Sequence, residues 1–315
     1  MRKIIGIGET ILDIIFRKNS AGEWQPDKAV AGGSTFNSVI TLGRLGLPTA
    51  LITELGNDSV GNDIKKFMQR YNVSTDYIDI YNPEDGITPV SLAYIDEDSN
   101  ANYTFYHRFP ADRLNVTIPL INEGDIIIFG SYFSVNPQLR NNILEILEFA
   151  KTRKAIIYYD PNFRKAHSHE AMKLMPSIIE NLEYANIVRG SDEDFNTLYH
   201  LTDPEKIYID KIKFYCPNFI YTQGGKGVEF FNRQGRCHLD ATPIDKPVST
   251  IGAGDTFNAG IVFGLIRHNV TLENLDSLTH EEWKPILQYA LDFSAQVCMC
   301  HDNYLPENVA AQYHL

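Results

Sequence analysis

A loop near the C-terminal end of the chain carries the clearest chemical signature. It reads STIGAGDTF from Ser249 to Phe257, and an apolar helix is expected over Asp255–His268. Small residues leave the backbone N–H groups of Gly252, Ala253 and Gly254 uncovered, and a helix N-terminus adds partial positive charge. The three amides, named here the anion hole, therefore suit phosphate oxygens and the charge that develops during phosphoryl transfer.

Asp255 follows the anion hole directly. A carboxylate at this place can accept the proton of a hydroxyl that attacks a γ-phosphate. The alternative is structural, because aspartate is also a favoured N-cap of helices. The loop alone leaves both interpretations open.

A second glycine-rich segment, AGGSTFN, lies near the N-terminus at 31–37 and precedes a predicted helix over Phe36–Leu45. Paired glycines, Gly32 and Gly33, let the backbone approach a ligand closely. Asn37 offers both a donor and an acceptor to ligand hydroxyls. The alternative is an ordinary glycine turn with Asn37 as a cap.

The elements that must position these residues alternate between short apolar runs and amphipathic stretches. No repeat or linker interrupts them, so a single domain over residues 1–315 is expected. The alternation predicts an α/β fold with a mostly parallel central sheet covered by helices. Strands are predicted at 3–7, 51–55, 125–129, 155–159, 185–188 and 219–222, and further helices at 58–71, 137–152 and 281–298.

Two segments do not follow this alternation of strands and helices and have strand-like patterns instead. Residues 11–31 turn near 20–22, and residues 88–108 contain a predicted hairpin around Asp96–Asn100. The two could pair into a small sheet beside the main one and close over a site. The alternative is a pair of excursions at the sheet edge.

The overall composition excludes several classes of protein. The net charge is −12 over 315 residues, which argues against nucleic-acid and membrane-surface partners because both attract basic faces. No apolar run reaches the length of a membrane span, and the first residues do not form a secretion signal. The four cysteines lack paired CxxC spacing, so free thiols and a cytoplasmic location are expected.

Several motifs in a fixed order resemble the ribokinase-like (PfkB-type) carbohydrate kinases, and fructokinases within them. Both glycine-rich segments match the signatures of that family. The first strand also matches, at Gly6–Glu9 with Asp13. So do two glycine loops, at Gly56–Gly61 and Thr222–Gly227 (TQGGKG), and the end of a middle strand, at Asp160–Arg164 (DPNFR). No Walker GxxxxGK[ST] segment is present, so a P-loop kinase is excluded.

The resemblance implies a three-layer α/β/α fold with a small β-sheet lid, and a homodimer formed through that lid. It implies that Asp255 is the general base beside the anion hole. It implies ATP as phosphoryl donor, with Mg²⁺ held mainly by ATP and water rather than by protein ligands. Sugar hydroxyls would be held by Asp13, Gly32, Gly33 and Asn37, and the nucleotide by Ser191, Asp194, Thr222, Gly224 and Gly227.

The expected reaction is phosphorylation of the primary hydroxyl of a free sugar, with fructose as the first choice. Phe105, His107 and Arg108 lie on the second predicted lid strand, where alternation turns only one of the last two toward the sugar. His107 is favoured because it shares the face of Phe105. The alternative is that His107 and Arg108 are ordinary surface residues of that strand. Arg108 or Arg164 could instead hold the carboxylate of 2-keto-3-deoxygluconate. Ribose, tagatose, a nucleoside, and a non-catalytic sensor remain further alternatives.

The chain also departs from the family pattern. Ser249 stands where an aspartate usually helps to hold a monovalent cation, and Asp302–Asn303 replaces a small Gly-Ala pair. Both departures argue against activation by K⁺. Ser191 and Asp194 stand where the family usually has the asparagine and the glutamate of N-x-x-E. Both side chains stay polar but are shorter.

Overall fold

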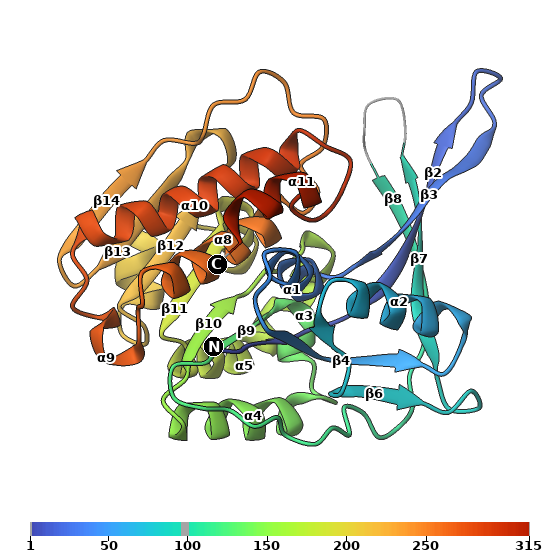
Figure 1. Cartoon of the computed structure of the whole chain (residues 1–315), viewed down its shortest axis with the longest axis horizontal. Helices are drawn as coiled ribbons and strands as arrows, with labels where there is room; N and C mark the ends of the chain where they lie inside the picture. The colour runs from blue at the N-terminus through green and yellow to red at the C-terminus, as the bar shows by residue number, and fades with distance from the viewer. Residues whose placement is uncertain (1, 96–100, 315) are drawn as a thin grey trace.

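The computed structural model describes residues 2–95 and 101–314. Its main sheet runs in the order β14-β13-β12-β11-β10-β9-β1-β4-β5, and β6 also pairs with β4 (Figure 1). The strands are β1 (Ile4–Ile7), β4 (Thr49–Gly56), β5 (Val73–Ser74), β6 (Ile78–Tyr81), β9 (Ile126–Gly130), β10 (Ile156–Asp160), β11 (Ile187–Ser191), β12 (Asn218–Thr222), β13 (Val228–Asn232) and β14 (Gly235–Leu239).

Pairing is parallel from β5 to β12 and antiparallel only at the edge formed by β13 and β14. The central strands are buried on both faces, which is why β9 reads as an almost unbroken run of isoleucine. All six predicted strands are confirmed. The antiparallel edge, in which a turn at 233–234 joins β13 to β14, was not predicted.

Helices cover both faces of this sheet. They are α1 (Ser34–Arg44), α2 (Ser59–Arg70), α3 (Ser131–Val135), α4 (Arg140–Thr152), α5 (Ala171–Tyr184), α6 (Asp192–Tyr199), α7 (Pro204–Ile207), α8 (Ala253–Arg267), α9 (Leu272–Leu275), α10 (His280–Cys298) and α11 (Glu307–Ala310). The predicted three-layer α/β/α arrangement is confirmed.

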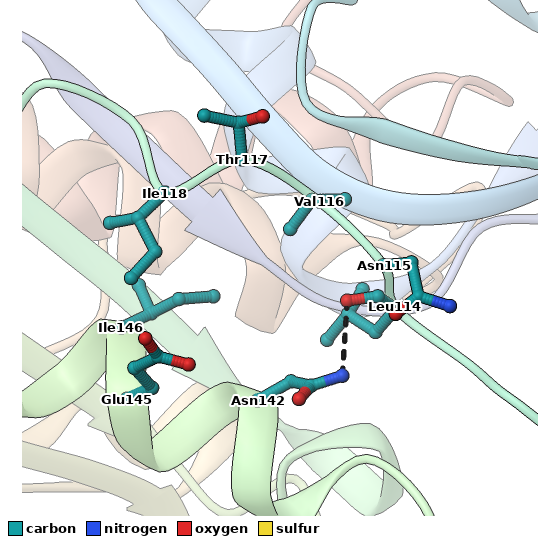
Figure 2. Close-up of a pocket in the computed structure, with 8 residues that line it drawn as sticks. All are labelled: Leu114, Asn115, Val116, Thr117, Ile118, Asn142, Glu145 and Ile146. Carbon is teal, nitrogen blue, oxygen red and sulfur yellow. Dashed lines mark hydrogen bonds between the residues drawn. The ribbon is translucent and has the colours of Figure 1, made fainter.

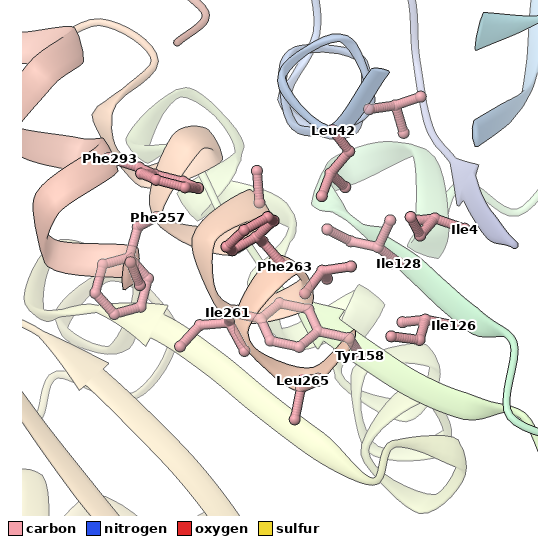
Figure 3. Packing of buried hydrophobic residues seen from close by; sticks show 14 of the residues in the cluster. Ile4, Leu42, Ile126, Ile128, Tyr158, Phe257, Ile261, Phe263, Leu265 and Phe293 are labelled. Atoms are coloured by element: carbon pink, nitrogen blue, oxygen red, sulfur yellow. The ribbon is translucent and has the colours of Figure 1, made fainter. Parts of the chain in front are cut away.

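Alternate side chains of the central strands pack into two separate hydrophobic cores, one on each face of the sheet. Ile126 and Ile128 of β9 pack with α1, α8 and α10, where Phe257, Ile261 and Phe263 of α8 are buried (Figure 3). Ile127 and Phe129 face the other side, against α4 and α6. The helix α8 is apolar all round because it lies between α1 and α10 as well as on the sheet.

A second, four-stranded sheet extends from this body (Figure 1). Its order is β3-β2-β7-β8, with β2 (Ile11–Lys18), β3 (Trp24–Gly32), β7 (Ile87–Ile95) and β8 (Ala101–Arg108). Both segments predicted to leave the main sheet therefore pair with each other, and β2 and β7 do so in parallel. The predicted turn at 96–100 lies outside the described residues. This sheet is called the lid sheet below.

Within the described ranges, no helix combines the length and the apolar character that crossing a membrane requires.

Candidate active site

Asp255 lies in the first turn of α8, inside the protein, and α8 starts two residues earlier than predicted. Gly252 takes the N-cap position with φ +80°, so the interpretation of Asp255 as the N-cap is wrong. A Cβ on Gly252 would lie 2.3 Å from the carbonyl oxygen of Asn303. The tight approach explains the glycine, because any side chain would clash with backbone as well as strain the left-handed conformation.

The N-terminus of α1 meets the N-terminus of α8 at the Asp255 carboxylate. Ser34 Oγ donates to Oδ1 at 2.9 Å, and Asn37 Nδ2 donates to Oδ2 at 2.7 Å. Ser38 Oγ also donates to the Asp255 carbonyl oxygen at 2.8 Å. Asn37 therefore does not cap α1, whose N-cap is Gly33. Its Oδ1 is buried and has no partner among the described residues.

The pKa of Asp255 is raised to about 6, and burial is the main cause. Hydrogen bonds from Asn37 and Ser34 and the positive charge of Arg164 act in the opposite direction, while the negative charge of Asp160 raises the pKa further. A carboxylate with this pKa is still largely ionised at neutral pH. It is also a stronger base than an ordinary aspartate, which suits proton abstraction.

A buried ion pair lies beneath the anion hole. Arg189 on β11 donates to Asp160 Oδ2 at 2.9 Å and to Thr222 Oγ1 at 2.7 Å, and Asn258 of α8 donates to Asp160 Oδ2 at 2.6 Å. A Cβ on Gly254 would lie 3.1 Å from both terminal nitrogens of Arg189. The guanidinium thus lies against the anion hole and, through Asp160 and Thr222, links β10, β11 and β12 to α8.

Sequence reasoning missed Arg189 and Asn258. The available signal was a single arginine inside the otherwise apolar run of β11, which reads IVRGS. A buried cation in such a strand requires an anionic partner. The sequence did not identify that partner, because Asp160 ends a different strand.

The residues predicted to bind nucleotide gather at the carboxyl ends of β11 and β12. Ser191 pairs with Thr222 across these strands. Asp194 is buried and closes the capping box of α6 by accepting from the Ser191 backbone N–H at 2.7 Å. Burial raises the pKa of Asp194. Ligands of open α/β sheets bind at this edge.

Gly224 and Gly227 form the turn from β12 to β13, and both have positive φ, at +55° and +89°. A Cβ on Gly227 would lie 2.1 Å from the carbonyl oxygen of Leu239, whereas Gly224 faces open space. Gly227 is therefore required by packing. Gly224 leaves the backbone accessible from outside.

Asp13 of β2 lies at the base of the lid sheet. Ser91 Oγ of β7 donates a short hydrogen bond to Asp13 Oδ1, and burial raises the pKa of Asp13. A Cβ on Gly32 would lie 3.1 Å from Asp13 Oδ2, so this glycine leaves space beside the carboxylate. Gly33 has φ +132°, and a Cβ there would lie 2.1 Å from the Glu9 carbonyl oxygen.

The register of the lid sheet orders the aromatic residues of β8. Phe105 pairs with Ser91, which pairs with Asp13, so the three lie in one row on one face. His107 shares that face by strand alternation, as predicted. Arg108 lies on the other face and donates to the Pro83 carbonyl oxygen at 2.6 Å.

Arg164 follows β10 and is exposed, near enough to Asp255 to lower the pKa of that carboxylate.

A shallow pocket elsewhere on the surface contains none of these residues. It lies between the 114–118 segment and α4, and Asn142 Nδ2 donates to the Leu114 carbonyl oxygen at 3.2 Å there (Figure 2). The cluster around Asp255 is therefore the better candidate, because it combines a perturbed carboxylate with two helix N-termini. Within residues 2–95 and 101–314, no three His, Cys, Asp or Glu side chains cluster as a metal site.

Comparison with known proteins identifies relatives in sequence and in fold. The chain is 29% identical to the fructokinase of Rhizobium leguminosarum bv. trifolii over 273 residues, which cover 85% of this chain and 81% of the relative. The fold is similar to that of the Vibrio cholerae O395 fructokinase solved with fructose, ADP and calcium. The TM-score is 0.81 at 20% identity, and the match covers 100% of this chain and 99% of that chain.

The aminoimidazole riboside kinase of Salmonella enterica, solved with aminoimidazole riboside and an ATP analogue, has the same fold. Its TM-score is 0.79 at 19% identity, with 99% of each chain covered. The family described as pfkB family carbohydrate kinase matches residues 1–308. The match over nearly the whole length shows that this chain belongs to the pfkB family of carbohydrate kinases.

Proposed function

We propose that this carbohydrate kinase transfers the γ-phosphoryl group of ATP to the primary hydroxyl of a free sugar, with fructose as the first candidate. The observation that carries the proposal is the buried Asp255 carboxylate, with a pKa of about 6, at the meeting point of two helix N-termini. Such a site accepts a proton from a hydroxyl and stabilises negative charge in the same place.

In the proposed reaction, Asp255 takes the proton of the attacking hydroxyl. The amides of Gly252, Ala253 and Gly254 stabilise the charge that develops on the transferred phosphoryl group. Asp13 and the unpartnered Oδ1 of Asn37 accept hydrogen bonds from other hydroxyls of the sugar, beside Gly32 and Gly33. ATP supplies the phosphoryl group and carries Mg²⁺, which neutralises charge on the phosphates.

The nucleotide is proposed to lie along the ends of β11 and β12. Backbone groups of Gly224 and Gly227 and the polar groups of Ser191, Asp194 and Thr222 line that edge. Thr222 and Asp194 are already hydrogen-bonded inside the protein, to Arg189 and to Ser191 respectively. Their proposed contribution is therefore to hold the shape of the edge, with Asp194 also orienting water around Mg²⁺.

The lid sheet is proposed to close over the sugar and exclude water that would otherwise hydrolyse ATP. Phe105 and His107 lie on the face of Asp13, which supports contact with the sugar. Arg108 is engaged with Pro83 on the other face, which favours His107 for this contact.

The opposite face of the lid sheet is proposed to pair with a second copy of the chain. Trp24 and Tyr94 form an edge-to-face aromatic contact there, and Trp24 remains 41% exposed. Tyr106, on the same face by register, is 53% exposed. Light scattering of the Tyr106→Asp variant checks this, and an unchanged dimer mass would count against it.

The K⁺ site of the family does not fit the residues present. Ser249 Oγ accepts from the Ile251 N–H at 3.2 Å, and the Asp302 carboxylate lies 3.8 Å from Arg44. Ser249 has no carboxylate, and the positive charge of Arg44 beside Asp302 disfavours a monovalent cation there. We therefore propose a kinase that does not depend on K⁺, in a cytoplasmic location.

The test is a coupled ADP-release assay with Mg·ATP and a panel of acceptors, each with and without K⁺. The panel contains fructose, ribose, tagatose, 2-keto-3-deoxygluconate, adenosine and fructose 6-phosphate. Release with fructose well above the others, unchanged by K⁺, is expected. Release with another acceptor alone would replace fructose as substrate. No release with any acceptor, with ATP still bound, would favour the non-catalytic sensor.

A further inference from the structure

The segment between α10 and α11 lies beside both the anion hole and the base of the lid sheet. This segment runs through residues 299–306 and is fixed at several points. Tyr304 donates through its hydroxyl to the Ala31 carbonyl oxygen on the lid strand β3, and the Leu305 carbonyl accepts from Arg44 at 2.9 Å. Its position is therefore set by both the lid sheet and α1.

Asn303 lies in the middle of this segment, between the anion hole and Asp13. Its backbone packs on Gly252, where a Cβ would lie 2.3 Å from the Asn303 carbonyl oxygen. Its side chain points to the other side, with Nδ2 at 3.9 Å from a Cβ built on Gly32. The same Cβ position is 3.1 Å from Asp13 Oδ2. Asn303 Nδ2 and Asp13 Oδ2 therefore border the same small space.

The Asn303 side chain has no hydrogen-bond partner of its own. The residue is only 6% exposed, yet no contact in the described part of the chain satisfies its amide. Its amide is not among the fully buried groups left without a partner, so it is open to a hydroxyl of a bound ligand. Among the described residues, Ser91 donates to Asp13 Oδ1, and none donates to Oδ2. The Asn303 amide donor and the Asp13 Oδ2 acceptor thus border the space beside Gly32 without a hydrogen bond between them.

We propose that Asn303 binds a hydroxyl of the acceptor sugar and determines which sugars the kinase accepts. One hydroxyl can donate to Asp13 Oδ2 while its oxygen accepts from Asn303 Nδ2, which satisfies both groups. The preferred sugar then carries a hydroxyl that reaches both Asn303 and Asp13. An analogue lacking this hydroxyl is discriminated against, because Asn303 Nδ2 and Asp13 Oδ2 then stay unpaired. This inference rests on the proposed function, since it assigns a further contact in the same site.

The test compares three variants on the sugar that the panel identifies. Asn303→Ala removes the amide, Asn303→Asp keeps the shape but removes the donor, and Asp302→Ala is the matched control. Asp302 is adjacent, 60% exposed, and makes only a long ion pair with Arg44 at 3.8 Å. We expect KM for the sugar to rise about tenfold in both Asn303 variants, with kcat changed far less, and no change in the control.

Two further readouts separate sugar binding from a merely structural role. Asn303→Ala should melt close to the native protein without sugar, because the removed amide bonds to no described residue, yet show a smaller sugar-induced rise. Mono-deoxy analogues should include one that the native kinase discriminates against by about 10- to 100-fold in kcat/KM and that Asn303→Ala accepts as well as the parent sugar.

Unchanged KM and unchanged deoxy-sugar discrimination in Asn303→Ala would overturn the inference while leaving the kinase assignment intact. If Asn303→Ala fails to fold, Asn303→Asp decides the question by the same measurements. A native protein that shows neither turnover nor a thermal shift with any sugar would instead overturn the proposed function, and this inference with it.

Discussion

At the scale of single residues, the proposed chemistry is assigned to Asp255 because its surroundings are arranged around one carboxylate. Each of its oxygens already accepts one hydrogen bond, from Ser34 and from Asn37. A carboxylate oxygen can accept a second, so a sugar hydroxyl can approach without displacing either donor. The two donors hold the carboxylate in one orientation, which a base needs for a defined proton transfer.

Replacing this carboxylate by an amide keeps the shape and removes the base. Asp255→Asn should lower kcat by about 10²–10⁴, the usual contribution of a general base, with little change in sugar affinity. The measurement is steady-state ADP release together with sugar binding by thermal shift. Native-like turnover in this variant would show that another group takes the proton.

The raised pKa of Asp255 predicts the acid limb of the pH profile. Because the base must be ionised, kcat/KM should fall about tenfold per pH unit below the pKa of about 6. The Ser34 hydrogen bond lowers this pKa, so Ser34→Ala should move the limb to higher pH, by about one pH unit. If the acid limb of the pH profile stays in place in Ser34→Ala, a group other than Asp255 causes it.

At the scale of elements, the anion hole depends on how closely the start of α8 approaches the segment that follows α10. Gly252→Ala would bring a Cβ to 2.3 Å from the Asn303 carbonyl oxygen at a residue with φ +80°. The matched control is Gly225→Ala, in another glycine-rich turn, where a Cβ meets nothing within 4 Å.

Gly252→Ala should therefore lower the free energy of unfolding by about 1–3 kcal/mol and reduce kcat, because the loop must shift. Gly225→Ala should leave the unfolding free energy nearly unchanged. Chemical denaturation of both variants measures the difference. Equal stability of the two would mean that the loop relaxes around the added methyl group without strain.

Arg189 couples β10, β11, β12 and α8 through Asp160, Thr222 and Asn258. Arg189→Met removes the cation and leaves Asp160 buried without its charge partner, which should cost about 3–5 kcal/mol of unfolding free energy. Arg189→Lys keeps the charge and should cost less. Denaturant unfolding and kcat are the measurements, and a stable, fully active Arg189→Met would show that the pair matters to neither.

At the scale of the whole molecule, the lid sheet and the body meet where the sugar is proposed to bind. Asp13 and Gly32 belong to lid strands, whereas Asn37, Asn303 and Asp255 belong to the body. A sugar that contacts both groups should hold the lid sheet against the body, since its binding energy is then shared between them.

Hydrogen exchange followed by mass spectrometry checks this closure. With sugar and a non-hydrolysable ATP analogue, amide exchange should slow in β2, β3 and β7 more than in the central strand β9. The comparison strand β9 is buried on both faces and serves as the control. Equal protection everywhere, or none in the lid sheet, would contradict closure over the site.

The sequence alone determined a large part of this protein. The six predicted strands and five predicted helices are present, because strands buried on both faces and amphipathic helices leave strong local patterns. The α/β class and the identity of the glycine loops followed from the same local signals. The positive φ of Gly252 and Gly33, in contrast, became known only from the structure.

Only the tertiary structure decided which groups meet. Asn37 and Asp255 are 218 residues apart in the chain, and Asp160 and Arg189 lie on neighbouring strands. The placement of Asn303 beside Asp13 depends on a segment with no regular pattern. Such contacts arise from the packing of separate elements, and the free energy of a buried polar group depends on partners brought close only by the fold. For that reason the sequence indicated the loop proposed to be catalytic, while the structure identified the groups around it.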